Sequence, residues 1–196
     1  MNSISPTNPI KKASYAPLAI YLHWLLAILI VGMIPLGWYM LSIEDSLGSD
    51  WYFMLHKSIG IVVSILVLLR LLWRSRHKPD RLPSNFPYWQ VMASKITHWL
   101  LYAAMITMPF VGIAGAMLSK DDISFFGVPL PRITSPNHDL GEIFFSLHSI
   151  IAWVLVALIS LHVVAALKHL INKDGVFERM WFSKKQVPSD GVIKDH

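Results

Sequence analysis

The residues of this sequence that could carry chemistry are histidines inside long apolar stretches. Five of the nine histidines lie in such stretches, and a sixth ends the last of them: His23, His56, His98, His148, His162 and His169. An ionisable side chain inside a membrane is costly and usually functional. Neutral imidazole is a ligand of haem iron, and the same stretches contain no aspartate or glutamate. The pattern therefore favours haem ligation over a proton pump or a carboxylate-bound di-iron site.

The spacing of His148 and His162 places one imidazole near each membrane surface. They are 14 residues apart, which is close to a whole number of α-helical turns, so both side chains lie on one helix face. At 1.5 Å per residue they are separated by about 21 Å along the helix axis. The hydrocarbon core of a bilayer is about 30 Å thick. This spacing predicts two haems stacked across the membrane, each bound by one of these histidines.

Depth also predicts the opposing ligand of each haem. His23 lies about one and a half turns into the first apolar stretch, and His56 lies just over one turn into the second. Because consecutive spans run in opposite directions, these two positions lie near opposite membrane surfaces. The predicted pairs of axial ligands are therefore His23 with His162 and His56 with His148.

Two other interpretations of these histidines were weighed. A histidine in a membrane helix more often forms a hydrogen bond to a neighbouring helix than a bond to a metal. Two histidines at this spacing, each with a partner at the same depth, favour the ligand interpretation. A zinc site is a weaker alternative, because the histidines fall at two depths and have no thiolate or carboxylate beside them.

Four apolar stretches are long enough to position these histidines as membrane-spanning helices. They cover residues 17–43, 51–73, 94–118 and 143–170, and a span needs about 20 apolar residues. Only 15% of the residues are charged, and the mean hydropathy is +0.49, as expected where the solvent is lipid. The predicted fold is an all-α, integral membrane four-helix bundle with two haems stacked across it. The absence of cysteine excludes iron–sulfur clusters and covalently attached haem.

Basic residues are distributed unevenly between the two sides of the predicted bundle. Fourteen of the 17 lie in or beside the two termini and the second connection, whereas the other side has Lys57, Lys120 and Arg132. The net charge of +5 could indicate nucleic acid as a partner, but this distribution indicates a membrane surface instead. The positive-inside rule predicts that both termini are cytoplasmic. The predicted organisation is a cytoplasmic arm (1–16), a four-helix membrane domain for the two haems (17–171) and a cytoplasmic tail (172–196).

Cationic side chains near the histidines are candidates for binding the haem propionates. Lys57 follows His56 directly, and Arg70 and Arg74 lie at the end of the second span. For the two arginines, the alternative is snorkelling to the membrane surface on the positive side. The loop over 119–142 contains an apolar, proline-rich run at 125–131. It is expected either to cover the mouth of the bundle as a lid or to lie among the lipid headgroups.

Short segments around the histidines carry a resemblance to a known family. They are 20–24 (IYLHW), 55–60 (LHKSIG), 96–102 (ITHWLLY), the Leu-His pairs at 147–148 and 161–162, and 165–169 (AALKH). Over residues 15–180 the chain resembles the bacterial cytochrome b561 family, which is similar to the cytochrome b subunits of nickel–iron hydrogenases and formate dehydrogenases. The resemblance implies a four-helix bundle in which four histidines hold two non-covalent haem b groups that exchange electrons with ubiquinone. It also implies that His169 and His98 are candidates for a quinone site on the cytoplasmic side.

The sequence therefore predicts transmembrane electron transfer between a periplasmic donor and the ubiquinone pool. Some members of the family resemble an enzyme that oxidises superoxide at the outer face, so the donor is expected to be superoxide or a small periplasmic redox protein. With superoxide as donor the chain would be a superoxide:ubiquinone oxidoreductase. Two alternatives stay open: a haem-binding membrane anchor subunit of a larger oxidoreductase, and a haem-free metal transporter that uses the histidines as ligands. Quinone reduction by the purified chain alone tests the first alternative, and a visible spectrum tests the second.

The charge asymmetry predicts that alkaline phosphatase fused to the C-terminus is inactive in living bacteria, because the positive-inside rule keeps that end in the cytoplasm. A fluorescent protein fused at the same position should fluoresce. As a control, phosphatase inserted in the loop over 119–142 should be active. An active C-terminal phosphatase would show that the predicted orientation is wrong.

Overall fold

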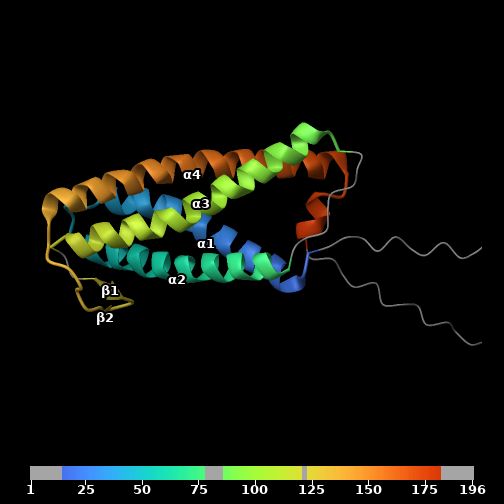
Figure 1. Ribbon diagram of the computed structural model, residues 1–196. Helices are drawn as coiled ribbons and strands as arrows, with labels where there is room; N and C mark the ends of the chain where they lie inside the picture. Colours follow the sequence, from blue (N-terminus) through green and yellow to red (C-terminus); the bar gives the residue numbers. More distant parts are fainter. Residues whose placement is uncertain (1–14, 78–85, 121–122, 182–196) are drawn as a thin grey trace, which may run out of the picture.

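Four long helices form the protein, with a short hairpin at one end of the bundle (Figure 1). The computed structural model describes residues 15–77, 86–120 and 123–181. The elements are α1 (Pro17–Ser42), α2 (Ser49–Arg76), α3 (Tyr88–Leu118), β1 (Ser124–Phe125), β2 (Val128–Pro129), α4 (His138–Asn172) and the 3-10 helix η1 (Phe177–Met180). All four long helices are long and apolar enough to cross a membrane. The predicted all-α membrane four-helix bundle is therefore confirmed.

The helix ends follow from local chemistry. Pro17 stands at the start of α1, where its missing N–H has no intrahelical partner to lose. At the start of α4, the Asn137 side chain accepts a hydrogen bond from the Leu140 amide at 3.1 Å, which satisfies one of the orphan donors of the first turn. Beyond the end of α3, Arg132 donates hydrogen bonds to the carbonyls of Met117, Ser119 and Lys120. A cation at that position also interacts favourably with the helix dipole.

The helices pack mainly as two pairs, α1 with α2 and α3 with α4, and α2 also packs on α3. One buried cluster, Leu26 with Val63 and Val67, fills the seam between α1 and α2. The other buried cluster, around Leu101 and Leu155, fills the seam between α3 and α4. The backbone of α4 does not run close to α1 or α2 over any length. This arrangement leaves the space between the two pairs to side chains.

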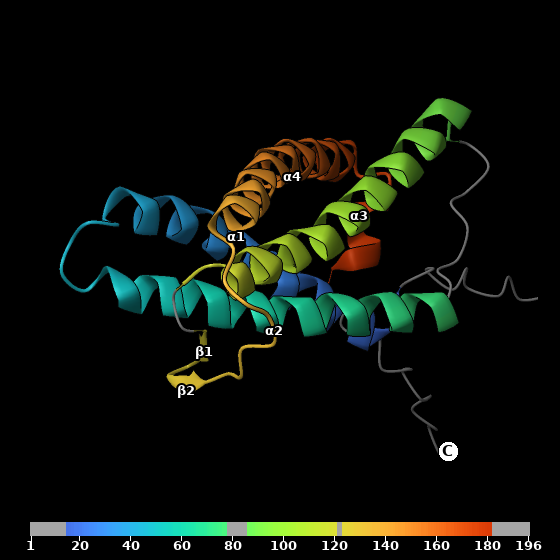
Figure 2. The same cartoon turned by 60° about the vertical axis from the view of Figure 1, so that its left-hand side comes forward.

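The hairpin lies beside α2 rather than across the mouth of the bundle (Figures 1 and 2). Its strands are antiparallel, with Phe125 opposite Val128, and its turn holds Phe126 and Gly127 at positive φ. The fully buried Ser58 of α2 anchors it: the hydroxyl accepts a hydrogen bond from the Phe126 amide at 2.8 Å and donates one to the Met54 carbonyl at 2.7 Å. The described part of this loop therefore packs against the side of α2, which differs from the expected lid over the mouth of the bundle.

The segment after α4 folds back onto the start of α1. The Trp24 indole donates a hydrogen bond to the Met180 carbonyl at 2.9 Å, and its ring makes an edge contact with Trp181. The Tyr15 amide donates to the Arg179 carbonyl at 3.3 Å. We call this end of the bundle, where α1 begins and α2 ends, the basic end, and the opposite one the hairpin end. Residues 172–196 were predicted only as a tail, and this contact was not anticipated. Residues 182–196 and the arm before Tyr15 lie outside the described residues.

The role of Ser58 generates a prediction. Ser58→Ala leaves the Phe126 amide without its partner, at a cost of about 1–3 kcal/mol if water does not replace it. Limited proteolysis from the hairpin side should then cut the loop over 119–137 faster than in the unchanged protein. Ser64→Ala is the matched control, because that hydroxyl only donates to the Gly60 carbonyl of its own helix, at 2.7 Å. Equal cleavage rates for the two variants would contradict the anchoring role.

Candidate functional site

At the hairpin end, two histidines from different helix pairs face each other across the bundle. The ring centres of His56 on α2 and His148 on α4 are 6.1 Å apart, and the ring planes are inclined by 74°. His148 donates from Nδ1 to the Met108 carbonyl of α3 at 3.1 Å, so its Nε2 carries the lone pair. The Nδ1 atom of His56 is buried and has no hydrogen-bond partner among the described residues. A buried nitrogen in that state is costly, so this pair is suited to binding something further.

At the basic end, three histidines meet. The ring centres of His23 on α1 and His162 on α4 are again 6.1 Å apart, with the planes inclined by 79°. The His98 ring of α3 makes an edge contact with His162 at 5.3 Å. His98 donates from Nδ1 to the Ser94 carbonyl one turn earlier, at 2.6 Å. The structure therefore brings together both predicted pairs and adds His98 to the second of them.

Two arginines of α2, Arg70 and Arg74, lie near the histidines of the basic end. Arg70 of α2 lies close enough to His23, His98 and His162 to interact with each electrostatically. Its guanidinium also donates to the Ala19 carbonyl of α1 at 2.9 Å. Arg74, one turn further, lies over the Tyr102 ring of α3 at 5.7 Å. Arg70 thus stands beside the predicted histidine pair and Arg74 beside His98, so an anionic group at this end would find a cationic field.

The remaining predicted residues have other neighbours. His169, at the last turn of α4, donates from Nδ1 to the Asp174 carboxylate at 2.6 Å and lies 6.1 Å from the Phe86 ring. His98 contacts His162, one of the predicted axial ligands. Lys57 at the hairpin end is half-buried beside His56.

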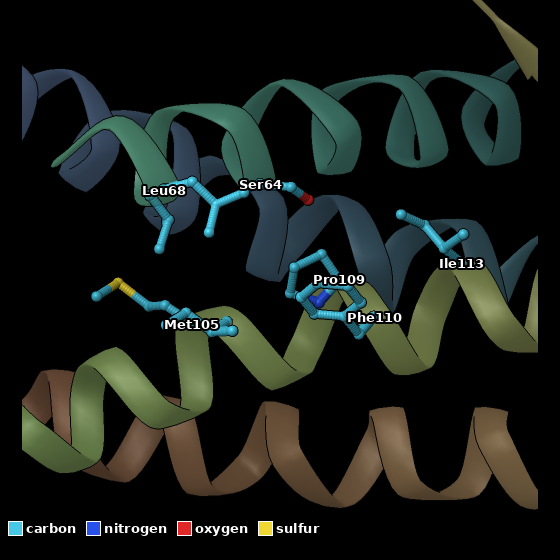
Figure 3. A pocket seen from close by; sticks show the side chains of 8 residues that line it. Ser64, Leu68, Met105, Pro109, Phe110 and Ile113 are labelled. Atoms are coloured by element: carbon cyan, nitrogen blue, oxygen red, sulfur yellow. The ribbon is translucent and has the colours of Figure 1, made fainter. Parts of the chain in front are cut away.

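A pocket in the described part of the chain is apolar and has none of these histidines in its lining. It lies between α2 and α3 around Pro109, and its wall includes Val67, Met105 and Phe110 (Figure 3). The hydroxyl of Ser64 also lines it but is engaged with the Gly60 carbonyl of its own helix. A groove with this lining offers contact to lipid chains and no group for redox chemistry, so the histidine pairs are the candidate site.

Comparison with known proteins identifies the family of the chain. Residues 14–183 match the family model described as prokaryotic cytochrome b561. The chain belongs to the prokaryotic cytochrome b561 family. Among its relatives, cytochrome b561 homolog 2 of Escherichia coli is 34% identical, with 85% of this chain and 90% of the relative covered. Cytochrome b561 homolog 1 of the same organism is 30% identical, with 85% of this chain and 96% of the relative covered. A probable superoxide oxidase of Yersinia pestis is 28% identical, with 87% and 97% covered.

Membership of this family defines the broad chemistry. The chain is a bacterial multi-pass membrane protein that binds haem b and transports electrons, as the resemblance in its sequence implied. These are the properties of a cytochrome, in which the bound group carries the electron and the protein sets its ligands, surroundings and access.

The histidine pairs of this cytochrome fit a metal held between two imidazoles. An imidazole nitrogen binds a metal at about 2 Å and lies roughly 1 Å from its ring centre, so two such rings on opposite sides of one ion are about 6 Å apart. The ring centres of His56 and His148, and of His23 and His162, are both 6.1 Å apart. The contact of His98 with His162 is shorter, at 5.3 Å. The pairs predicted from depth therefore have the better spacing for a shared metal.

Several supporting groups of the site were not found from the sequence. A Cβ on Gly37 would lie 3.3 Å from Cε1 of His56, so this glycine of α1 leaves room for the His56 ring. The Met108 and Ser94 carbonyls fix the Nδ1 protons of His148 and His98. Backbone carbonyls often orient metal-binding histidines in this way. The sequence does not reveal which backbone carbonyl lies near a histidine. It shows that Gly37 lies in an apolar stretch, but not that His56 is its neighbour in the fold.

Gly112 provides a test of the hairpin-end pair. A Cβ at this position of α3 would lie 2.9 Å from Nδ1 of His148, so Gly112→Ala forces the ring to move and breaks its hydrogen bond to Met108. Overpacking of this kind costs about 1–3 kcal/mol. We expect the haem content of the purified protein, measured by a pyridine haemochrome assay, to fall. Gly32→Ala is the control, because a Cβ there meets nothing within 4 Å. Full haem content in Gly112→Ala would contradict this account of the site.

Proposed function

We propose that this cytochrome carries electrons across the bacterial inner membrane through two haem b groups. His56 and His148 would be the axial ligands at the hairpin end, and His23 and His162 those at the basic end. The observation that supports this proposal is the repetition of one geometry: two histidine pairs, each 6.1 Å between ring centres, at opposite ends of a membrane-spanning bundle. α4 contributes one histidine to each pair, so its rise sets their separation at about 21 Å.

In this proposal, residues of the chain bind and orient the haem groups that members of the family carry. Bound haem provides one-electron chemistry at its iron. The Met108 carbonyl holds the proton of His148 on Nδ1, which leaves Nε2 to bind metal. Arg70 and Arg74 are suited to the propionates at the basic end, since guanidinium pairs well with carboxylate. Lys57 is the corresponding cation at the hairpin end.

The electron acceptor in this proposal is ubiquinone, which binds at the basic end. The asymmetry of basic residues predicts that this end and both termini face the cytoplasm. His169 and His98 are the residues proposed to meet the quinone. An imidazole can donate a hydrogen bond to a quinone carbonyl and pass on a proton.

The electron donor in this proposal is superoxide or a small periplasmic redox protein at the hairpin end. Support for superoxide comes from the relative in Yersinia pestis that is described as a probable superoxide oxidase. With superoxide, the balanced reaction takes two superoxide anions, one quinone and two protons to two molecules of oxygen and one quinol. A cationic rim of Lys57 and Arg132 at the hairpin end would attract superoxide, and the acidic residues on the same side of the bundle weaken that attraction.

Removal of single ligands tests the proposed haem sites. His148→Ala should lose the haem of the hairpin end, and His162→Ala that of the basic end, so each purified variant should keep about one haem per chain. Either variant should also stop electron flow from a donor outside vesicles to quinone in the membrane, because electrons must pass both sites. His98→Ala should keep both haems, since its distance to His162 is short for a shared metal.

His138→Ala is the matched control, because this exposed histidine stands at the start of α4 with no part in either pair. Two haems per chain in His148→Ala or in His162→Ala would overturn the ligand assignment. Loss of a haem in His98→Ala with full retention in His23→Ala would instead identify His98 as the ligand opposite His162.

A further inference from the structure

The turn after α4 places a carboxylate against His169. Lys173 and Gly175 both have positive φ, at 52° and 84°, and they turn the chain back so that Asp174 faces the last helical turn. Its Oδ1 accepts a hydrogen bond from the Val176 amide at 3.2 Å, and its Oδ2 accepts one from Nδ1 of His169 at 2.6 Å. The two side chains are only 22% and 23% exposed. Both carboxylate oxygens are therefore held, and the pair is more ordered than an ordinary surface contact.

This geometry decides which nitrogen of His169 faces outward. The proton on Nδ1 is committed to Asp174, so Nε2 is the ring nitrogen left for a ligand. Partial burial would raise the pKa of Asp174, but hydrogen bonds from His169 and the Val176 amide outweigh it and hold the pKa below its usual value. The carboxylate is thus negative at neutral pH and lies 2.6 Å from Nδ1 of His169.

The other groups around His169 do not compete for this role. Phe86, at the start of the chain segment leading into α3, presents its ring edge-on at 6.1 Å. The ammonium of Lys168, the neighbouring residue on α4, lies over the Trp89 ring of α3 at 5.8 Å. Within the described residues, Asp174 is therefore the charged group placed directly against His169.

We propose that Asp174 is a positioning residue for quinone reduction: it orients His169 and balances the charge of its protonated ring while Nε2 gives a proton to a quinone oxygen. This inference rests on the proposed function. Conversion of one quinone to one quinol consumes two electrons and two protons. The electrons come from the cytochrome reduced by its donor, and each proton leaves Nε2 and is replaced from water at the basic end. Throughout, Nδ1 keeps its proton on the hydrogen bond to Asp174.

A purely structural role for this pair makes a different prediction. The contact could simply close the end of α4, where a histidine is favourable to the helix dipole. Asp174→Asn separates the two roles, because the amide keeps its oxygen for the Val176 N–H but presents an NH2 donor to His169 in place of the negatively charged acceptor. A structural role would leave proton-linked chemistry unchanged in this variant.

The experiment measures reoxidation of the purified, haem-loaded protein after reduction with stoichiometric dithionite. Anaerobic mixing with a short-chain ubiquinone is followed by stopped-flow absorbance between about pH 5.5 and 9, a range that brackets histidine titration. Asp174→Asn should slow reoxidation by about tenfold or more near neutral pH, and the decline of the rate toward high pH should begin at lower pH. Reoxidation by ferricyanide, which takes no proton, should be unchanged. Asp174→Glu should restore part of the rate, and Asp139→Asn, which removes an exposed carboxylate at the other end of α4, should have no effect.

Nuclear magnetic resonance provides a readout apart from activity. In the reduced, diamagnetic holoprotein labelled with ¹⁵N-histidine, the His169 ring, assigned by its absence in His169→Ala, should carry its proton on Nδ1. In Asp174→Asn this preference should weaken. His169→Ala should slow quinone reduction as Asp174→Asn does, and the double variant should be no slower than His169→Ala alone, because the two residues act as one unit.

The possible failures are distinguishable. If quinone does not reoxidise the unchanged protein at any pH, the proposed function itself is wrong. If it does, and Asp174→Asn matches the unchanged protein in rate, pH profile and ring tautomer, only the role of Asp174 is wrong. Equal slowing with quinone and with ferricyanide would likewise overturn the positioning role, because it would indicate damage to the fold or to the haem sites.

Discussion

The distance between the two imidazole rings within each histidine pair is the constraint on which the rest of this structure depends. A metal shared by two histidines sets their ring centres roughly 6 Å apart, and both pairs meet that distance at 6.1 Å. Because α4 supplies one histidine to each pair, α1 and α2 must present the opposing rings at two depths. The need for glycine at positions 37 and 112 then follows, because a side chain on Gly37 or Gly112 would crowd a histidine ring.

The distribution of buried residues agrees with this constraint. The apolar clusters fill the seams between α1 and α2 and between α3 and α4, and the histidines occupy the space between these two pairs. In lipid, apolar side chains gain little by packing against each other rather than against the bilayer. Groups that bind between the pairs therefore contribute to holding them together, and a ligand that binds only the folded protein stabilises it. Loading of the site and stability of the bundle are linked for this reason.

The spans and the histidine pairs could be predicted from the sequence because hydropathy and helical rise are local properties. The contacts that shape the two ends could not, because they join residues far apart in the chain. Ser58 binds the Phe126 amide, Trp24 binds the Met180 carbonyl, and neither partner carries a distinctive signal. The same holds for Asp174. The sequence around it indicates a polar tail, and only the turn at Gly175 places its carboxylate against His169. The ring contact of His98 with His162 was also not anticipated, and the role of His98 at a quinone site stays a prediction.

Electron paramagnetic resonance of the oxidised, purified protein tests the central claim most directly, because it counts irons and reports on their ligands together. The account predicts two low-spin ferric irons per chain. Both should show the strongly anisotropic signal of bis-imidazole haem with steeply crossed ligand planes, since the ring planes are inclined by 79° and 74° in the two pairs. A single low-spin iron per chain, or a high-spin signal from an intact preparation, would contradict the assignment of two histidine-ligated haems to this bundle.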